Sequence, residues 1–233
     1  MISKKYSCIF IHIPKTAGQS VEQLFIDDEG LTKDTKYQLL LGINPDPEKG
    51  PERISHLKAC EYKQLGYVSE AEYENLFKFS FVRNPWERIV SEYRYRHFWK
   101  QFSFRDFVLS HLPEEDSYCD YSRHIIPQSD YLYDESGKLI VDYVGRFETL
   151  QDDFYKICQA IGFDNNVIPH INKSGLKKFR HKIKRQIGLT KSFQKDFKDY
   201  RAFFDDDTAS IVENMYRKDI ENFGYCFDGS AKK

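Results

Sequence analysis

Residues 8–20 read CIFIHIPKTAGQS, and this stretch determines which fold to expect. Its first part, 8–13, is short, apolar and rich in β-formers, which is typical of a buried parallel strand, and Pro14 ends it. Apolar side chains then recur at helical spacing, so a helix is expected to open between Gly18 and Ser20. The segment therefore predicts a strand, a tight loop and a helix in direct succession.

Two more buried strands are predicted at 78–82 (KFSFV) and 139–144 (LIVDYV). Helical periodicity follows each of them, over 86–98 and over 152–161. Because strands alternate with helices, the chain predicts an α/β fold around a central parallel sheet. Gly145 is expected to end the third strand, and Gly162 to end the helix over 152–161. Other expected elements are a helix over 69–77, in which Ser69 and Glu72 form a capping box, helices over 103–112 and 208–223, and an acidic, polar loop over 113–124.

Length and composition restrict the class of protein. A chain of 233 residues predicts a single domain over 1–233. A hydrophobic content of 40%, with 19 Phe and 16 Tyr, excludes disorder as the main state. A formal net charge of −1 argues against a protein that binds nucleic acid or a membrane over its whole surface. Residues 173–201 are the exception, because eleven Lys and Arg against two Asp give this segment a net charge of +9.

No apolar run is long enough for a membrane span, and the N-terminal segment is not a signal peptide because His12, Pro14 and Lys15 interrupt its apolar run. The cysteines are odd in number, widely spaced and form no CxxC pair, which predicts reduced thiols, a cytoplasmic location and no metal site. The five cysteines are Cys8, Cys60, Cys119, Cys158 and Cys226.

The loop after the first predicted strand suits an anion. Backbone amides at the start of the following helix point outward at its positive end, Lys15 adds a full charge, and Thr16 and Ser20 add hydroxyl donors. The alternative is a structural turn that carries a surface lysine. The loop is not GxxxxGK[ST], since its lysine precedes Gly18, and this difference disfavours an ordinary ATPase or kinase.

The segment at 79–93, FSFVRNPWERIVSEY, predicts a second anion site. Arg83 stands where the second strand ends, at the sheet edge where ligands bind, and its planar fork can hold a phosphate. Ser91 lies on the following helix and offers another donor. The alternative is that Arg83 and Arg88 form surface ion pairs with Glu87 or Glu92.

Taken together, IPKTAG at 13–18 and FVRNPWERIVSEY at 81–93 resemble the sulfotransferase superfamily. The resemblance is strongest to its carbohydrate-type group, which includes heparan-sulfate 2-O-sulfotransferase-like and many bacterial enzymes. It extends from about residue 8 to residue 227. Further matching segments lie at 103–107 (SFRDF), 127–132 (PQSDYL), 141–150 (VDYVGRFETL) and 219–225 (DIENFGY).

This resemblance implies a three-layer α/β sandwich similar to P-loop nucleoside kinases. It also implies the donor 3′-phosphoadenosine 5′-phosphosulfate (PAPS), the product 3′,5′-ADP and a hydroxyl acceptor, with a carbohydrate favoured. Fixed cations would take the place of a metal. The first loop would hold the 5′-phosphosulfate, and Arg83 with Ser91 would grip the 3′-phosphate. The residues of that loop are Lys15, Thr16, Ala17, Gly18, Gln19 and Ser20.

Removal of the acceptor proton needs a base, and similar enzymes carry a histidine at the place of His56. We therefore expect His56 to be the general base and Lys15 to stabilise charge on the leaving phosphate. His12 is expected to be a buried, hydrogen-bonded strand residue and ranks second, and Glu22 could orient a base or the acceptor. No convergent context is visible for the other histidines, His97, His111, His124, His170 and His181.

The basic segment 173–201 has three interpretations. It could be a flap over the donor, with Lys173 and Ser174 in contact and Asn172, Lys177 and Arg180 nearby. It could be a groove for an anionic acceptor, or a solvated helix. The alternatives to a sulfotransferase are a P-loop-like nucleotide kinase and a non-catalytic anion-binding module. No nucleic-acid partner is expected.

Overall fold

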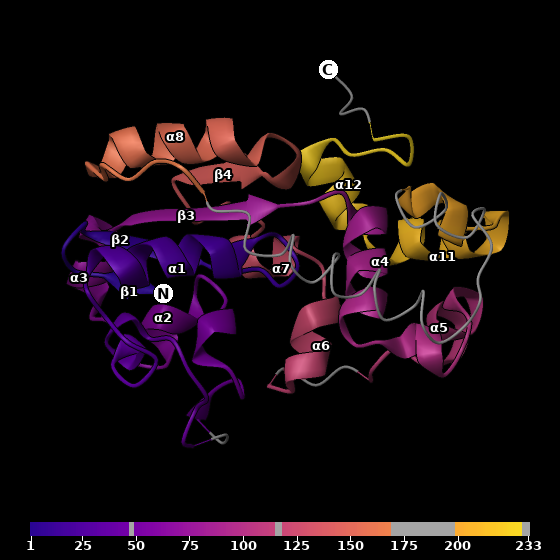
Figure 1. Cartoon of the computed structure of the whole chain (residues 1–233), viewed down its shortest axis with the longest axis horizontal. Helices are drawn as coiled ribbons and strands as arrows, with labels where there is room; N and C mark the ends of the chain where they lie inside the picture. The colour runs from indigo at the N-terminus through magenta and orange to yellow at the C-terminus, as the bar shows by residue number, and fades with distance from the viewer. Residues whose placement is uncertain (47–48, 115–117, 169–198, 230–233) are drawn as a thin grey trace, which may run out of the picture.

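The computed structural model describes residues 1–46, 49–114, 118–168 and 199–229. In this part of the chain four strands form one sheet in the order β1-β2-β3-β4 (Figure 1). The strands β2 (Cys8–Ile11), β3 (Phe77–Val82) and β4 (Tyr143–Arg146) run parallel, whereas the short β1 (Ile2–Ser3) pairs antiparallel with β2. The expected parallel sheet is therefore present, with one antiparallel edge strand.

Helices cover both faces of the sheet, because successive strand residues point to opposite sides. On one face Phe10 and Phe79 pack with α1 (Gly18–Asp28) and α8 (Leu150–Ile161). On the other, Ile9 and Ile11 pack with residues of four helices. These are α2 (Glu61–Gln64), α3 (Glu70–Asn75), α7 (Ser129–Leu132) and α12 (Arg217–Phe223). The three layers make an α/β sandwich.

A third apolar cluster lies beyond the carboxyl end of β3, where Figure 1 shows a separate group of helices. Trp86, Tyr93, Phe107 and Val212 are buried in it. Its helices are α4 (Pro85–Tyr95), α5 (Phe104–Ser110), α6 (Asp120–Ile125) and α11 (Asp206–Met215). Short 3-10 turns occupy Lys36–Leu39, Ile54–His56, Phe98–Lys100, Phe147–Thr149 and Tyr200–Phe203.

Local sequence signals that need no tertiary information are confirmed. Helix α1 begins at Gly18 as expected, and Ser69 and Glu72 form a complete capping box at the start of α3. Gly162 ends α8 in the left-handed conformation at φ 69°. The five cysteines are all free thiols.

Several expected boundaries differ from the structure. The strand expected over 8–13 ends at Ile11, and the helix expected over 69–77 ends at Asn75 because β3 begins at Phe77. The third strand was expected at 139–144 with Gly145 ending it, but β4 covers Tyr143–Arg146 and Gly145 lies within it. A β-carbon at Gly145 would lie 2.5 Å from Phe81 Cε1, so glycine is needed there for the neighbouring strand's ring rather than for a turn. The helix expected over 86–98 ends at Tyr95.

Two other elements differ because of tertiary contacts. The loop expected over 113–124 contains helix α6, which a buried ion pair between Arg123 and Glu61 anchors at 2.6 Å. The helix expected over 208–223 is interrupted at Tyr216, whose buried side chain donates to the Ile125 carbonyl. In the described ranges, no helix combines the length and the apolar composition needed to cross a bilayer.

Candidate active site

The loop between β2 and α1 is strained, and its helix start is uncapped. Lys15 and Ala17 both adopt left-handed backbone conformations, at φ 72° and 73°, which non-glycine residues rarely take. Ala17 is the N-cap of α1 but offers no side-chain acceptor, and the first turn carries no acidic residue. The positive end of this 11-residue helix is thus not neutralised by a carboxylate of its own first turn.

His12 determines the path of this loop. Its ring is buried, and a β-carbon at Gly18 would lie only 2.0 Å from its Cδ2 atom. Its Nδ1 lies 2.6 Å from Oε1 of Glu22 on α1. The expectation that His12 is buried and hydrogen-bonded is confirmed, and Glu22 orients this histidine.

The loop hydroxyls are buried. Thr16 donates its hydroxyl to the Ile13 carbonyl at 2.8 Å, inside the loop itself. Ser20 is also buried, whereas Gln19 is exposed. Thr16 therefore shapes the loop. The Ser20 amide donates to the Ala17 carbonyl at 2.9 Å, which leaves the amides of Gly18 and Gln19 as the donors at the helix start that have no backbone acceptor among the described residues.

Arg83 touches the first loop. Its Nη1 donates to the Lys15 carbonyl at 3.1 Å, and its Nη2 donates to Oε1 of Glu87 at 2.7 Å. Its guanidinium packs on the Phe147 ring at 3.9 Å, and its buried Nε has no partner among the described residues. Ser91 lies two turns along α4 and is half-buried. The two motifs therefore meet, and Arg83 retains a buried donor.

Arg88 does not form the surface ion pair that was considered for it. It is fully buried, and its three nitrogens donate to the carbonyls of Pro14, Ile126 and His124 at 3.2, 3.0 and 2.9 Å. A buried charge needs hydrogen-bond partners, and these three bonds fix the first loop relative to α6.

A buried amide and carboxylate hold the backbone of Arg83. Gln128 accepts from the Arg83 amide and donates to its carbonyl, both at 2.8 Å. Asp219 accepts from the amides of Gln128 and Ser129 at 2.8 and 2.7 Å, and burial raises its pKa. The segments 127–132 and 219–225 thus support the Arg83 corner, a role that sequence analysis missed.

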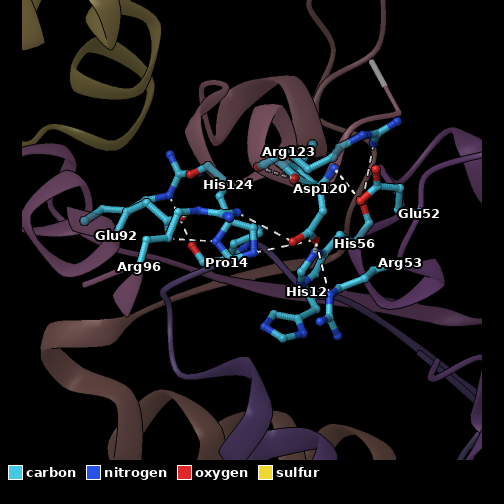
Figure 2. Close-up of polar contacts among 12 residues, drawn as sticks. His12, Pro14, Glu52, Arg53, His56, Glu92, Arg96, Asp120, Arg123 and His124 are labelled. Atoms are coloured by element: carbon cyan, nitrogen blue, oxygen red, sulfur yellow. Dashed lines mark hydrogen bonds and ion pairs between the residues drawn. The ribbon is translucent and has the colours of Figure 1, made fainter. Parts of the chain in front are cut away.

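Three histidine rings lie in a row (Figure 2). The ring of His56 is 5.0 Å from that of His12 and 5.0 Å from that of His124, nearly perpendicular to both. All three are buried. The expectation that His124 has no convergent context is wrong, because α6 carries it to His56 from a distant part of the sequence.

Asp120, which sequence analysis also missed, holds His56 in place. Its Oδ1 lies 3.0 Å from Nδ1 of His56 (Figure 2). Burial alone would raise the pKa of Asp120, but the His56 hydrogen bond and the charges of His124, His56 and Arg53 lower it to about 2. The ionised carboxylate favours the His56 tautomer with its proton on Nδ1, which leaves the Nε2 lone pair free.

Burial keeps the rings of His56 and His124 neutral. It lowers the pKa of His56 to about 4, against the hydrogen bond from Asp120, and the neighbouring His12 and His124 lower it further. Burial also lowers the pKa of His124, against its hydrogen bond with Glu92. A neutral imidazole at pH 7 can accept a proton, so His56 has the state that a general base requires.

Lys15 approaches the histidine row through Tyr95. Its Nζ lies 3.8 Å from the centre of the Tyr95 ring, and that ring stacks on His124 at 5.7 Å. Burial lowers the pKa of Lys15 to about 8 against the charge of Glu92, and Arg83 and Arg96 lower it further. A bound anion would favour its charged form.

Lys173 and Ser174, the expected donor contacts, lie outside the described residues, as do Asn172, Lys177, Arg180, His170 and His181.

Comparisons with known proteins agree with this geometry. A family model described as "Sulfotransferase family" matches residues 1–226. An uncharacterized protein of Archaeoglobus fulgidus is 31% identical to the chain over 116 residues, which cover 48% of this chain and 90% of that protein. No solved structure matches the chain significantly.

The buried His56 predicts acid sensitivity. The unfolded chain binds a proton at His56 below about pH 6.5, whereas the folded protein does so only near pH 4. The unfolded state therefore binds more protons between pH 6.5 and pH 4. We expect His56 alone to lower the free energy of unfolding by on the order of 2–3 kcal/mol as the pH falls through this range.

Thermal unfolding between pH 7 and pH 4 measures this effect. His56→Gln should flatten the loss, whereas His111→Gln, which removes an exposed imidazole, should keep it. An equal slope in wild type and His56→Gln would contradict the buried, neutral state of His56.

Proposed function

The chain belongs to the sulfotransferase family, and from this premise we propose that it transfers a sulfuryl group from PAPS to a hydroxyl group of a carbohydrate. One observation carries the proposal. His56 is a buried neutral imidazole oriented by Asp120, and it lies beside a strained, cationic loop at an uncapped helix start. A base and an anion cradle at one end of a sheet are what sulfuryl transfer to an alcohol needs.

The donor would be held at two places, each with one cationic side chain and further hydrogen-bond donors. Lys15 and the backbone amides of Gly18 and Gln19 would hold the 5′-phosphosulfate. The Ser20 hydroxyl would be a further donor, with Thr16 and Ala17 shaping the loop. Arg83 and Ser91 would hold the 3′-phosphate, with Lys173 and Ser174 as further donor contacts. Strain at Lys15 and Ala17 supports this assignment, because such backbone conformations concentrate at ligand clamps.

The protein's own groups would perform three tasks. His56 Nε2 would take the acceptor's proton while Asp120 stabilises the imidazolium that forms. Lys15 would neutralise charge on the leaving phosphate, as cations do in phosphoryl transfer through a loose transition state. Arg83 would fix the donor's position relative to both. No metal has a step in this proposal.

Two alternatives are less favoured. A P-loop-like nucleotide kinase would need a lysine after the glycine, whereas Lys15 precedes Gly18. A non-catalytic anion-binding module would not need a histidine held by a buried carboxylate, and such perturbed groups cluster at catalytic sites.

Loss of the base should abolish most of the transfer. We expect His56→Ala to lower kcat/KM about 10²- to 10⁴-fold, because a positioned base contributes this much. Asp120→Asn should lower it less, because an amide oxygen can still accept from Nδ1–H but carries no charge. The readout is transfer from PAPS, with 3′,5′-ADP binding confirming an intact donor site. His111→Ala is the matched surface control, and near-full transfer by a folded His56→Ala variant would refute the assignment.

The pH dependence of kcat/KM should depend on the protonation of His56 and Lys15. In the free enzyme, kcat/KM should fall below about pH 4, where His56 becomes protonated, and above about pH 8, where Lys15 loses its proton. Lys15→Arg should remove the alkaline limb, because a guanidinium stays charged. An alkaline limb that is unchanged in Lys15→Arg would show that another group sets it.

A further inference from the structure

The carboxylate and rings around His56 form a cluster with the spacing of a metal site. The ligand atoms of His56, Asp120 and His124 all lie within 4.8 Å of one another. Oδ1 of Asp120 lies 3.0 Å from Nδ1 of His56 and 3.7 Å from Nε2 of His124. Figure 2 shows both rings directed at this carboxylate. Metal–ligand bonds of about 2.0–2.2 Å place neighbouring ligand atoms at similar separations.

The arrangement around His124 points to a cation. Its Nδ1 lies 2.7 Å from Oε2 of Glu92, so this nitrogen carries the proton and Nε2 presents its lone pair to Asp120. The 3.7 Å gap is too long for a hydrogen bond, and two acceptor atoms face each other across it. A carboxylate on the far nitrogen of a histidine is also the usual outer support of a metal-binding imidazole.

We propose that His56, Asp120 and His124 bind a divalent transition-metal ion of the zinc class. Two imidazoles and one carboxylate are ligands that zinc and its neighbours prefer, whereas magnesium and calcium prefer all-oxygen sites. Three protein ligands leave a fourth position for water.

Two arginines flank the Asp120 carboxylate, and their positions determine which of its oxygens a metal can bind. Arg96 Nη2 lies 3.6 Å from the other oxygen, Oδ2, and leaves Oδ1 to the metal. Arg53 Nε lies 3.5 Å from Oδ1, but its side chain is 48% exposed and can turn into solvent. The metal thus displaces one surface ion pair, and such a pair contributes little stability.

Bound metal would inhibit sulfuryl transfer, a consequence that rests on the proposed function. When the ion takes Nδ1 of His56, the neutral ring keeps its single proton on Nε2. The nitrogen assigned to the acceptor then becomes a donor and can no longer remove a proton. The site is therefore an inhibitory one, in which metal and acceptor proton compete for the same imidazole.

Metal binding is tested first, without turnover. Cobalt(II) added to the metal-free protein should give the visible absorption bands of a low-coordinate nitrogen and oxygen site, which zinc abolishes and magnesium does not. Zinc affinity is then measured by competition with a coloured chelator. Glu92→Gln should weaken zinc binding about 10- to 100-fold, and His124→Gln should weaken it more.

His111→Gln is the matched control, because it removes an exposed histidine outside the cluster, at the C-cap of α5, and should bind zinc as wild type does. Wild-type protein with no cobalt bands and no stoichiometric zinc binding would overturn the site, whether or not the variants fold. Equal zinc affinity in wild type and a folded His124→Gln variant would also overturn it.

Transfer assays separate the two claims. Zinc should inhibit wild type and His111→Gln equally, and a chelator should restore activity. Active transfer by a protein that binds no zinc would overturn the metal site and leave the proposed function intact. Stoichiometric zinc binding without inhibition would support the metal site but contradict its inhibitory effect. Because that effect follows from His56 acting as the base, this result would also contradict the role of His56.

Discussion

The buried guanidinium of Arg88 is the constraint on which the site depends. It donates to the carbonyls of Pro14, His124 and Ile126, and so joins the loop after β2 to helix α6 through α4. A charge in this position is tolerated only while all three acceptors stay in place, because leaving one donor unmet costs about 1–3 kcal/mol or more. The path of the loop and the position of the histidine row are therefore set together.

Burial and ion pairing together keep the carboxylates of the site ionised and two of its histidines neutral, an arrangement that suits proton transfer. Carboxylates that pair with histidines stay ionised, since the pKa values of Glu22, Glu92 and Asp120 are all lowered despite burial. The rings of His56 and His124 stay neutral because their desolvation outweighs the nearby carboxylates. The site thus combines ionised anchors with a neutral acceptor of protons, and the cationic Lys15 and Arg83 lie on the donor side.

The elements that the sequence predicted are those whose formation depends on residues near one another along the chain. Hydrophobic periodicity located β2, β3 and α1, and the capping residue Ser69 located α3, because these signals are local. Asp120 and His124 were missed since α6 is stabilised by contacts with remote residues rather than by its own propensity. The clamp of Gln128 and Asp219 on Arg83 joins segments 91 residues apart, which no periodicity reveals.

The central claim is a donor site that requires a 3′-phosphate, and a thermal-shift titration tests it most directly. Wild-type protein is titrated with 3′,5′-ADP and, in parallel, with 5′-ADP plus magnesium. Our account predicts stabilisation by 3′,5′-ADP alone, of about 2.7 kcal/mol at 100 times its Kd. Stabilisation by 5′-ADP with magnesium, and none by 3′,5′-ADP, would contradict the account and favour a kinase.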